Sequence, residues 1–189
     1  MKKVLFINAC VRPESRTLEL AESVLQKLGA SAEEVNLYSI PLCALDMKGM
    51  EKRDFARINQ NFDDPVFDLP KQFAQADEIV VAAPYWDMMF PAVLKTYLEN
   101  VTVCGLTFVY SQSGRPQGMC KAKSLYYVTT AGGFIGPNDF GFSYVEALSR
   151  NFFGISEVRR FTAEGLDIAG ANVDEIVNKA KDKINEELC

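Results

Sequence analysis

The sequence predicts an α/β protein in which an open parallel sheet of five strands is covered by helices on both faces. Short apolar segments, typical of buried strands, alternate along the chain with longer segments that have helical spacing. That alternation is the pattern of consecutive strand–helix–strand units. The 189 residues show no internal repeat and no linker, so a single domain over residues 1–189 is expected.

The chain opens with a predicted strand, a helix and a second strand. Residues 4–8 form an apolar run without polar alternation, as expected of a central strand. Apolar residues then recur at helical spacing over residues 18–28, and Gly29 is a suitable helix end. Residues 34–38 alternate between polar and apolar types and predict the second strand.

Residues 41–70 are less regular than the segments on either side. They carry several charges and a proline-containing break at residues 63–65. We expect a short helix around residues 51–61 and a further helix near Lys71. The segment fits either a lid over a binding site or a surface elaboration.

The middle of the chain contains the clearest core strand. Residues 79–83 are apolar, and Pro84 ends the strand. Pro91 suits the first turn of a helix that is predicted to run to Val101. Residues 107–118 predict a hairpin or loop excursion, because turn signals follow a strand-like segment.

Two more strands and two helices complete the prediction. Strands are expected at residues 125–129 and 158–162, with a helix over residues 145–152 between them. A last helix begins after Asn172, which can form a capping box with Glu175. The apolar residues of this helix share one face, as in a helix packed on a sheet.

The composition excludes several catalytic mechanisms. The chain has no histidine, which rules out a Ser-His-Asp triad, a Cys-His pair and a His-bound metal. If the protein is an enzyme, its chemistry is expected to reside in a bound cofactor. A formal net charge of −5 and the lack of a basic run argue against a nucleic-acid partner. No apolar stretch approaches ~18 residues, so no membrane partner is expected.

The cysteine pattern predicts reduced thiols and a cytoplasmic protein. The cysteines are widely spaced and odd in number, and no C-x-x-C motif occurs, so neither a metal site nor a disulfide framework is indicated. The apolar run near the N-terminus is too short for a secretion signal, and Arg12 follows it closely. The cysteines are Cys10, Cys43, Cys104, Cys120 and Cys189.

Three turns of the predicted fold are expected to meet. In open parallel sheets, ligands bind beyond the carboxyl ends of the strands, at the point where the strand order reverses. The turns that follow the first, third and fourth predicted strands should therefore converge on one site.

The first of these turns, residues 10–17, joins a buried strand to the N-terminus of a helix. Free backbone N–H groups and the helix dipole favour an anion there. Ser15 and Thr17 add hydroxyl groups, while Arg12 and Arg16 add positive charge. A phosphate monoester fits this turn better than a pyrophosphate, because no G-x-G-x-x-G or Walker A motif is present. In the simpler alternative, Ser15 only caps the helix and the arginines are solvated.

The second turn, residues 84–91, is unusually apolar for a connecting loop. It holds two aromatic residues, two methionines and a phenylalanine. These side chains suit stacking on a flat aromatic ligand, and they suit a hydrophobic plug or a dimer contact equally well.

The third turn, residues 130–134, contains paired glycines after a core strand. Glycine lets the backbone approach a ligand closely, although a simple strand-to-helix turn with positive φ explains the pair too. A phosphate cradle, an aromatic loop and a glycine rim at one edge together describe a site for flavin mononucleotide (FMN).

With these segments considered together, the chain resembles the flavodoxin-like NAD(P)H-dependent FMN reductases, in particular the FMN-dependent azoreductases and quinone reductases. The strongest similarity lies in Ala83–Tyr97, which is similar to the family's A-P-[MY]-[YW]-N-F-x-x-P-x-x-L-K-x-[YW] stretch along the isoalloxazine. Further similarity lies in Ser15–Leu18, Gly105–Phe108 and Val128–Gly133. The chain departs from the family at Asp87, where azoreductases commonly carry asparagine.

The resemblance implies a flavodoxin-like sheet with strand order 2-1-3-4-5, an FMN cofactor and NAD(P)H as co-substrate. It implies a ping-pong transfer of hydride to a small-molecule acceptor: a quinone, azo compound, nitroaromatic or flavin. It also implies a homodimer with the site near the interface. No catalytic side chain is needed, because the flavin carries the chemistry. The expected cofactor-binding residues are Cys10, Arg12, Ser15, Arg16, Thr17, Pro84, Tyr85, Trp86, Asp87, Met88, Thr130, Ala131, Gly132 and Gly133.

Two other functions fit the same fold. A flavodoxin-type carrier would shuttle single electrons without efficient NAD(P)H oxidation, but the T-x-T-G-x-T phosphate loop usual in such carriers is missing. A flavin-free binding or regulatory module is the second alternative, because a fold does not by itself determine a function.

Overall fold

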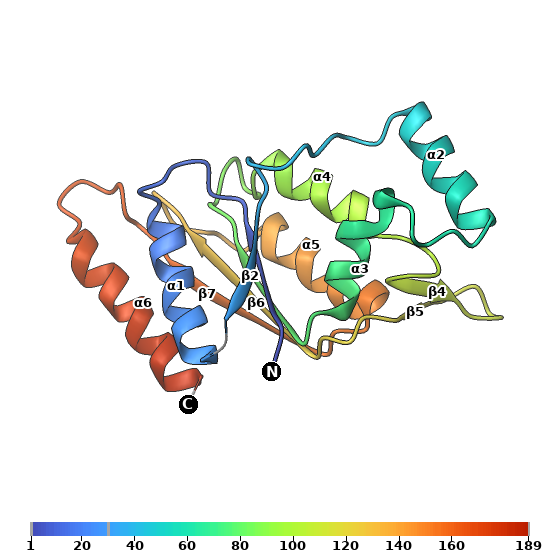
Figure 1. The fold of residues 1–189 in the computed structure, drawn as a ribbon. Helices are drawn as coiled ribbons and strands as arrows, with labels where there is room; N and C mark the ends of the chain where they lie inside the picture. The colour runs from blue at the N-terminus through green and yellow to red at the C-terminus, as the bar shows by residue number, and fades with distance from the viewer. Residues whose placement is uncertain (1, 30, 189) are drawn as a thin grey trace.

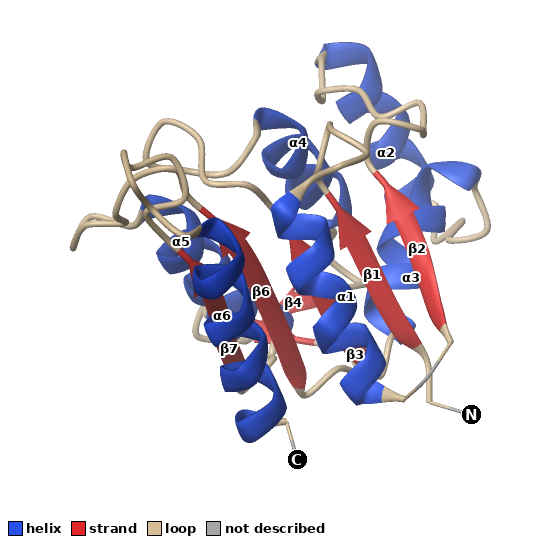
Figure 2. Ribbon diagram, turned by 90° about the vertical axis from the view of Figure 1, so that its left-hand side faces the viewer, coloured by secondary structure: helices blue, strands red, loops and turns tan. Residues whose placement is uncertain are grey.

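The main sheet of the protein is parallel, as predicted. The computed structural model describes residues 2–29 and 31–188. The strand order β2-β1-β3-β6-β7 is the predicted order 2-1-3-4-5 when only the strands of this sheet are counted. The arrows in Figure 2 point the same way, so the carboxyl ends of the strands share one edge. The strands are β1 (Val4–Asn8), β2 (Ala32–Asn36), β3 (Glu78–Ala82), β6 (Ser124–Thr130) and β7 (Glu157–Ala163).

Helices cover both faces of this sheet (Figure 1). One face carries α1 and α6, which also contact each other. The other face carries α3, α4 and α5. The helices that cover the sheet are α1 (Arg16–Leu28), α3 (Asp68–Gln75), α4 (Ala92–Val101), α5 (Phe140–Leu148) and α6 (Val173–Glu187).

Both faces of the central strand β1 are buried. Leu5 and Ile7 belong to the apolar core beneath α3 and α4, while Val4 and Phe6 belong to the core beneath α1 and α6. Side chains of a strand alternate between faces, so a strand buried on both faces needs apolar residues at every position. This is the physical reason for the uninterrupted apolar run that predicted the strand.

Two element boundaries differ from the prediction. The second strand, β2, runs from Ala32 to Asn36, two residues earlier than predicted, because it pairs with β1 from Val4↔Ala32 onward. The helix predicted at residues 51–61 is α2, which spans Met47–Ile58. It begins earlier because the Asp46 side chain caps it, accepting a hydrogen bond from the Gly49 N–H at 2.7 Å.

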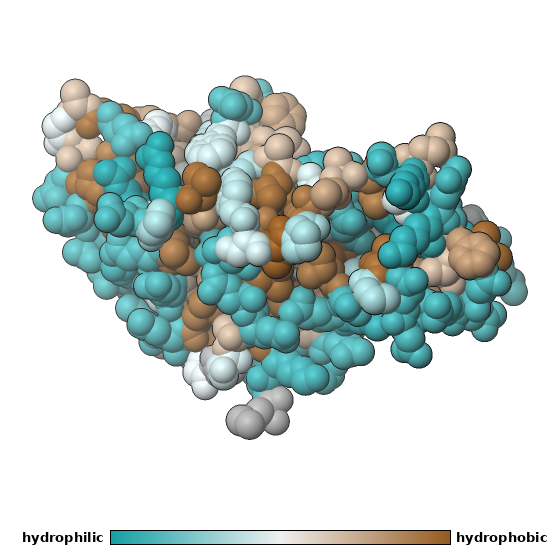
Figure 3. Space-filling model, turned by 45° about the horizontal axis from the view of Figure 1, so that its top comes forward, coloured by the Kyte–Doolittle hydropathy of each residue, from teal (hydrophilic) through white to brown (hydrophobic). Residues whose placement is uncertain are grey.

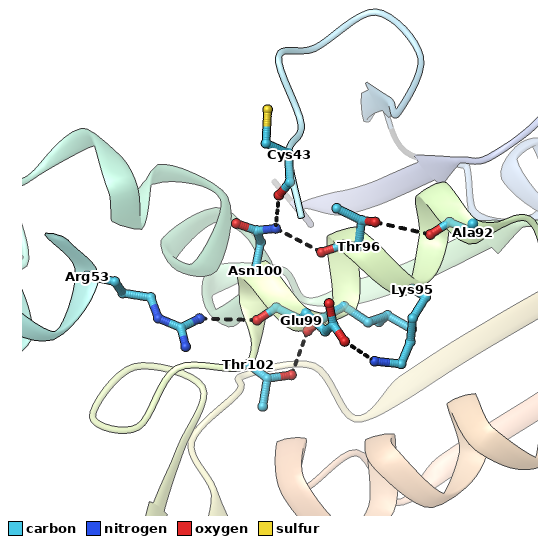
Figure 4. A network of polar contacts seen from close by, with 9 residues as sticks. Cys43, Arg53, Ala92, Lys95, Thr96, Glu99, Asn100 and Thr102 are labelled. Atoms are coloured by element: carbon cyan, nitrogen blue, oxygen red, sulfur yellow. Dashed lines mark hydrogen bonds and ion pairs between the residues drawn. The ribbon is translucent and has the colours of Figure 1, made fainter. Parts of the chain in front are cut away.

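The segment that contains α2 lies on the outer side of α4 (Figures 1 and 4). Asn100 Nδ2 donates to the Cys43 carbonyl oxygen at 3.0 Å, and Arg53 Nη1 donates to the Glu99 carbonyl oxygen at 3.2 Å. These bonds tie the segment to the helix that follows β3. The segment that carries α2 is therefore attached to α4 and adds no strand to the main sheet.

The predicted hairpin is present as the two-stranded sheet of β4 (Phe108–Tyr110) and β5 (Pro116–Gly118). It packs against a π-helical extension of α5 at residues 149–153. A Cβ at Gly118 would lie 2.1 Å from the Gly154 backbone nitrogen, so only glycine permits this approach. The predicted helix at residues 145–152 thus combines the end of α5 with this extension.

Candidate functional site

The turns after β1, β3 and β6 meet at the carboxyl edge of the sheet. The Ala83 N–H donates to the Val128 carbonyl oxygen, and the Tyr85 N–H donates to the Thr130 carbonyl oxygen, both at 3.0 Å. The hydroxyl oxygens of Thr17 and Thr130 lie 2.6 Å apart. Hydrogen bonds therefore join the second turn to the third and the third turn to the first, as the topology requires.

A cavity of about 410 Å³ lies where these turns meet. This volume is within the range of ~300–1,000 Å³ that is usual for small-molecule sites. The loop that follows β7 contributes a further part of the wall. The lining residues are Val11, Arg12, Glu14, Ser15, Arg16, Thr17, Pro84, Tyr85, Trp86, Thr130, Ala131, Gly132, Leu166 and Asp167.

The first turn leaves β1 in a direction set by a buried asparagine. Asn8 Oδ1 accepts a hydrogen bond from the Cys10 N–H at 2.9 Å. Asn8 Nδ2 donates to Glu34 Oε1 at 2.8 Å, which ties the turn to β2. A buried amide that is satisfied on both sides holds the backbone in one conformation.

The N-terminus of α1 forms one wall of the cavity. Ser15 is the N-cap residue, and its hydroxyl accepts a hydrogen bond from the Leu18 N–H at 3.4 Å. The N–H groups of the first helical turn, which begins with Arg16 and Thr17, have no intrahelical acceptor. The side chains of Arg12 and Arg16 line the same end of the cavity, so hydrogen-bond donors and two guanidinium groups gather there.

The aromatic turn forms the opposite wall and contains a tight two-residue hairpin. Trp86 and Met89 exchange backbone hydrogen bonds of 2.7 and 2.8 Å. The two residues between them, Asp87 and Met88, have φ values of 50° and 67°. Positive φ at both central residues is typical of a type I′ turn. Tyr85 and Trp86 line the cavity, whereas Asp87 and Met88 lie at the exposed tip of the turn.

The Tyr85 hydroxyl stays protonated near neutral pH. Burial is the largest cause that raises the pKa of Tyr85 above its ordinary value, and the carboxylates of Asp139 and Glu164 raise it further. A neutral phenol is a hydrogen-bond donor at the cavity wall and not a nucleophile.

The glycine rim supports the loop that follows β7. Gly132 lines the cavity, and its carbonyl oxygen accepts a hydrogen bond from the Asp167 N–H at 2.9 Å. A Cβ at Gly132 would lie 2.3 Å from Asp167 Oδ2, so the two residues fit closely. Gly133 lies outside the cavity wall, where its carbonyl oxygen accepts a hydrogen bond from the Gly165 N–H at 2.8 Å.

Most of the residues predicted from the sequence line the cavity. The predicted residues that do not line it are Cys10, Asp87, Met88 and Gly133, which support or flank the walls. The sequence reading missed Val11, Glu14, Leu166 and Asp167. Leu166 and Asp167 follow the last strand of the same parallel sheet, so the carboxyl-edge rule could have pointed to them had it been applied to that turn.

Cys10 is a core residue and not part of the wall. Its side chain is buried, and its sulfur lies 3.9 Å from the Ala82 carbonyl oxygen. Burial raises the pKa of the Cys10 thiol to about 11. The thiol is therefore neutral at physiological pH and supplies no thiolate to the cavity.

Within residues 2–29 and 31–188, no group of three or more acidic or cysteine side chains is arranged to hold a metal ion. No helix in the described part of the chain has an apolar stretch long enough to cross a membrane. The cavity thus combines the N-terminus of a helix and two arginines at one end with an aromatic wall and a close backbone rim. This arrangement suits a bound phosphorylated heterocycle that carries its own chemistry.

Comparison with known proteins agrees with this description. A family model described as flavodoxin-like fold matches residues 2–188. The FMN-dependent NADH:quinone oxidoreductase of Clostridium beijerinckii is 31% identical over 195 residues, covering 98% of both chains. The protein of the same name from Lachnoclostridium phytofermentans is 32% identical over 196 residues, covering 97% of this chain and 96% of its own.

Solved structures show the same fold. An azoreductase from Bacillus anthracis superposes with a TM-score of 0.85 at 24% identity, covering 100% of this chain and 99% of its own. An FMN-dependent NADH-azoreductase from Bacillus anthracis in complex with FMN gives a TM-score of 0.79 at 21% identity, covering 100% of this chain and 98% of its own.

Iodoacetamide at about pH 8 is expected to label Cys43 and to spare Cys10 and Cys120 in the folded protein, because the thiolate is the reactive form. Burial raises the pKa of Cys10 to about 11 and that of Cys120 to about 12, so both thiols stay neutral at that pH, whereas Cys43 is exposed. Peptide mass spectrometry measures the labelling, and unfolded protein is the control in which all three react. Fast labelling of Cys10 in the folded protein would show that the first turn opens to solvent.

Proposed function

Since the chain belongs to the flavodoxin-like family that includes the FMN-dependent NADH:quinone oxidoreductases, we propose that it is an FMN-dependent NAD(P)H oxidoreductase. It passes hydride from NAD(P)H through bound FMN to a quinone, azo, nitroaromatic or flavin acceptor. NADH is the reductant in the names of its relatives, and we propose NADH here as well. The observation that carries this proposal is the cavity at the carboxyl edge, with a phosphate-binding end and an aromatic wall.

The donor set at the N-terminus of α1 fits the phosphate of FMN. Ser15 and Thr17 supply hydroxyl groups, and the first turn of α1, whose N–H groups lack intrahelical acceptors, lines the same cavity. Arg16 and Arg12 line the cavity at this end and supply positive charge. Hydrogen bonds from charged donors to phosphate are shorter and stronger than those between neutral groups, so this end anchors the cofactor.

The opposite wall fits the flat ring. Tyr85 and Trp86 offer aromatic faces, and Pro84 fixes the backbone that leads to them. Ala131 and Gly132 present backbone with little side chain, which allows close approach of a planar ligand. We assign the wall to these residues and to Thr130, while Cys10, Asp87, Met88 and Gly133 hold or flank the turns.

FMN, when bound, supplies the hydride-accepting and hydride-donating chemistry. The chain's contribution is binding, orientation and electrostatics, because the cavity wall has no histidine and no ionised thiol. The reductant and the acceptor would approach the same aromatic wall in turn, which is a ping-pong order. We place the protein in the cytoplasm, a proposal supported by the free thiols of Cys10, Cys43, Cys104 and Cys120.

We further propose that the protein is a homodimer with the site near the interface. Trp86, which lines the cavity, and Met88, which flanks it, are both exposed, and Phe134, at the end of the glycine rim, is 76% exposed. Figure 3 shows apolar residues gathered toward the middle of the face that carries the carboxyl edge, with polar residues around them. Exposed apolar side chains ringed by polar ones are typical of protein interfaces.

Purified protein is expected to be yellow, or to become yellow with added FMN. In the absence of oxygen, it should oxidise NADH catalytically only when it holds FMN and a quinone or another of the proposed acceptors is present. Absorption spectra, fluorescence titration with FMN and NADH consumption measure these properties, with FMN alone as the control. Lack of FMN affinity would contradict the proposal. A stable blue semiquinone without NADH oxidation would indicate a one-electron carrier instead.

The double variant Ser15→Ala/Thr17→Ala is expected to lose about 2–4 kcal/mol of FMN-binding free energy, because two hydroxyl contacts to a phosphate are removed. Riboflavin, which lacks the phosphate, should bind with nearly unchanged affinity. Ser23→Ala, on the same helix but outside the cavity, is the matched control. Thr17 also contacts Thr130, so circular dichroism should establish that the variant is folded. An unchanged dissociation constant for FMN would rule out this phosphate assignment.

Analytical ultracentrifugation of the wild type is expected to show a dimer that Phe134→Glu converts to monomer, because a buried unpaired carboxylate is costly at an apolar contact. Gln26→Glu, an exposed site on α1, adds the same charge away from the cavity and should leave the dimer intact. A monomeric wild type, or a Phe134→Glu variant that stays dimeric, would contradict this arrangement.

A further inference from the structure

An ion pair crosses the phosphate-binding end of the cavity. Arg16 Nη1 lies 3.2 Å from Asp167 Oδ1. The two residues are 151 positions apart in the sequence, at the start of α1 and in the loop after β7, and both line the cavity. The side chains of Arg16 and Asp167 are 44% and 74% exposed, so the pair lies in solvent rather than in the core.

The loop backbone holds Asp167 in place independently of Arg16. The Asp167 N–H donates to the Gly132 carbonyl oxygen at 2.9 Å, and the neighbouring Leu166 N–H donates to the Ala131 carbonyl oxygen at 3.2 Å. The carboxylate lies directly over Gly132, since a Cβ there would be 2.3 Å from Oδ2. The backbone that carries Asp167 is thus held at the rim of the cavity, and its carboxylate contacts the guanidinium that the proposed function assigns to phosphate.

We propose that the carboxylate of Asp167 competes with the phosphate of the flavin for Arg16. Through this competition, Asp167 determines how strongly the site prefers phosphorylated flavins over riboflavin. This inference rests on the proposed function, in which Arg16 contacts the phosphate of FMN. A phosphate that takes Arg16 must displace the carboxylate of Asp167, whereas riboflavin leaves the ion pair intact. Asp167 therefore lowers the affinity for FMN without lowering the affinity for riboflavin.

The competition is uneven and favours the phosphate. Exposed ion pairs between an arginine and a carboxylate contribute little to stability. A phosphate has more charge than a carboxylate and can accept several hydrogen bonds from a guanidinium and from the helix N-terminus at once. The phosphate of FMN therefore displaces the carboxylate from Arg16. Breaking the ion pair lowers the affinity for FMN modestly and does not prevent binding.

Glu14 provides a matched control within the same cavity. It lines the wall and carries the same charge as Asp167, but its carboxylate makes no ion pair or hydrogen bond with any residue that the structure describes. Neutralising Glu14 changes the charge of the cavity by the same amount without freeing Arg16. The comparison separates competition for Arg16 from general repulsion between carboxylates and phosphate.

The test is the dissociation constant of FMN and of riboflavin for the full-length wild type, Asp167→Asn and Glu14→Gln, measured by flavin fluorescence and calorimetry. Asp167→Asn is expected to tighten FMN binding about three- to fivefold, the scale of an exposed ion pair, and to leave riboflavin binding unchanged. Glu14→Gln is expected to change FMN binding less. Weaker FMN binding in Asp167→Asn would overturn the inference, because it would mean that Asp167 positions Arg16 for the phosphate. An equal gain in Glu14→Gln would overturn it too.

A double-mutant cycle with Arg16→Gln provides the second arm. If Asp167 competes for Arg16, then Asp167→Asn has little effect on FMN binding once Arg16 is replaced. An undiminished effect in the Arg16→Gln background would contradict competition.

Inorganic phosphate is the probe that distinguishes failure of this inference from failure of the flavin assignment. Phosphate should raise the thermal midpoint of Asp167→Asn more than that of the wild type, because ligands that bind the native state stabilise it. This result in a protein without FMN affinity would support the role of Asp167 and refute the flavin function. Equal phosphate stabilisation in the two proteins would overturn the role of Asp167.

Discussion

The parallel alignment of β1, β3 and β6 is the constraint on which the rest of the molecule depends. Ile7 is level with Val81 across β1 and β3, and Val81 is level with Tyr127 across β3 and β6. The three strands end at the same edge, so the turns that follow them must share one space. Hydrogen bonds between the turns then fix that space, and the first turn of α1, whose N–H groups lack intrahelical acceptors, lines it.

The electrostatics of the cavity suit binding rather than acid–base catalysis. Two arginines and two carboxylates line it, and the only ion pair found among these four within the described residues joins Arg16 to Asp167. Burial raises the pKa values of Tyr127 and Cys10, so this phenol and this thiol stay neutral near physiological pH. A site of this kind orients its ligand and sets the electrostatic field around it, and a redox cofactor would contribute the chemistry.

The aromatic turn shows how a local conformation separates sequence neighbours. Trp86 and Met88 belong to one apolar segment, yet Trp86 lines the cavity and Met88 does not. The reason is the tight hairpin between Trp86 and Met89, in which Asp87 and Met88 take positive φ values and project from the tip. Asp87 stands where azoreductases commonly carry asparagine. Its residue lies at the exposed tip of the turn and not in the cavity wall, so this departure from the family does not change the lining of the cavity.

The sequence by itself determined the parallel sheet and the three turns that converge, because buried strands and amphipathic helices require apolar residues at fixed spacing. The strand order followed from the resemblance to a known family and not from that spacing. The sequence also indicated most of the cavity wall, since the carboxyl-edge rule selects turns without coordinates. Only the tertiary structure decided the remaining details. In the folded protein the Cys10 side chain points into the core, and α2 lies on the outer side of α4. Asp167 forms an ion pair with Arg16. These outcomes depend on side-chain direction and on contacts between distant segments, which local periodicity does not encode.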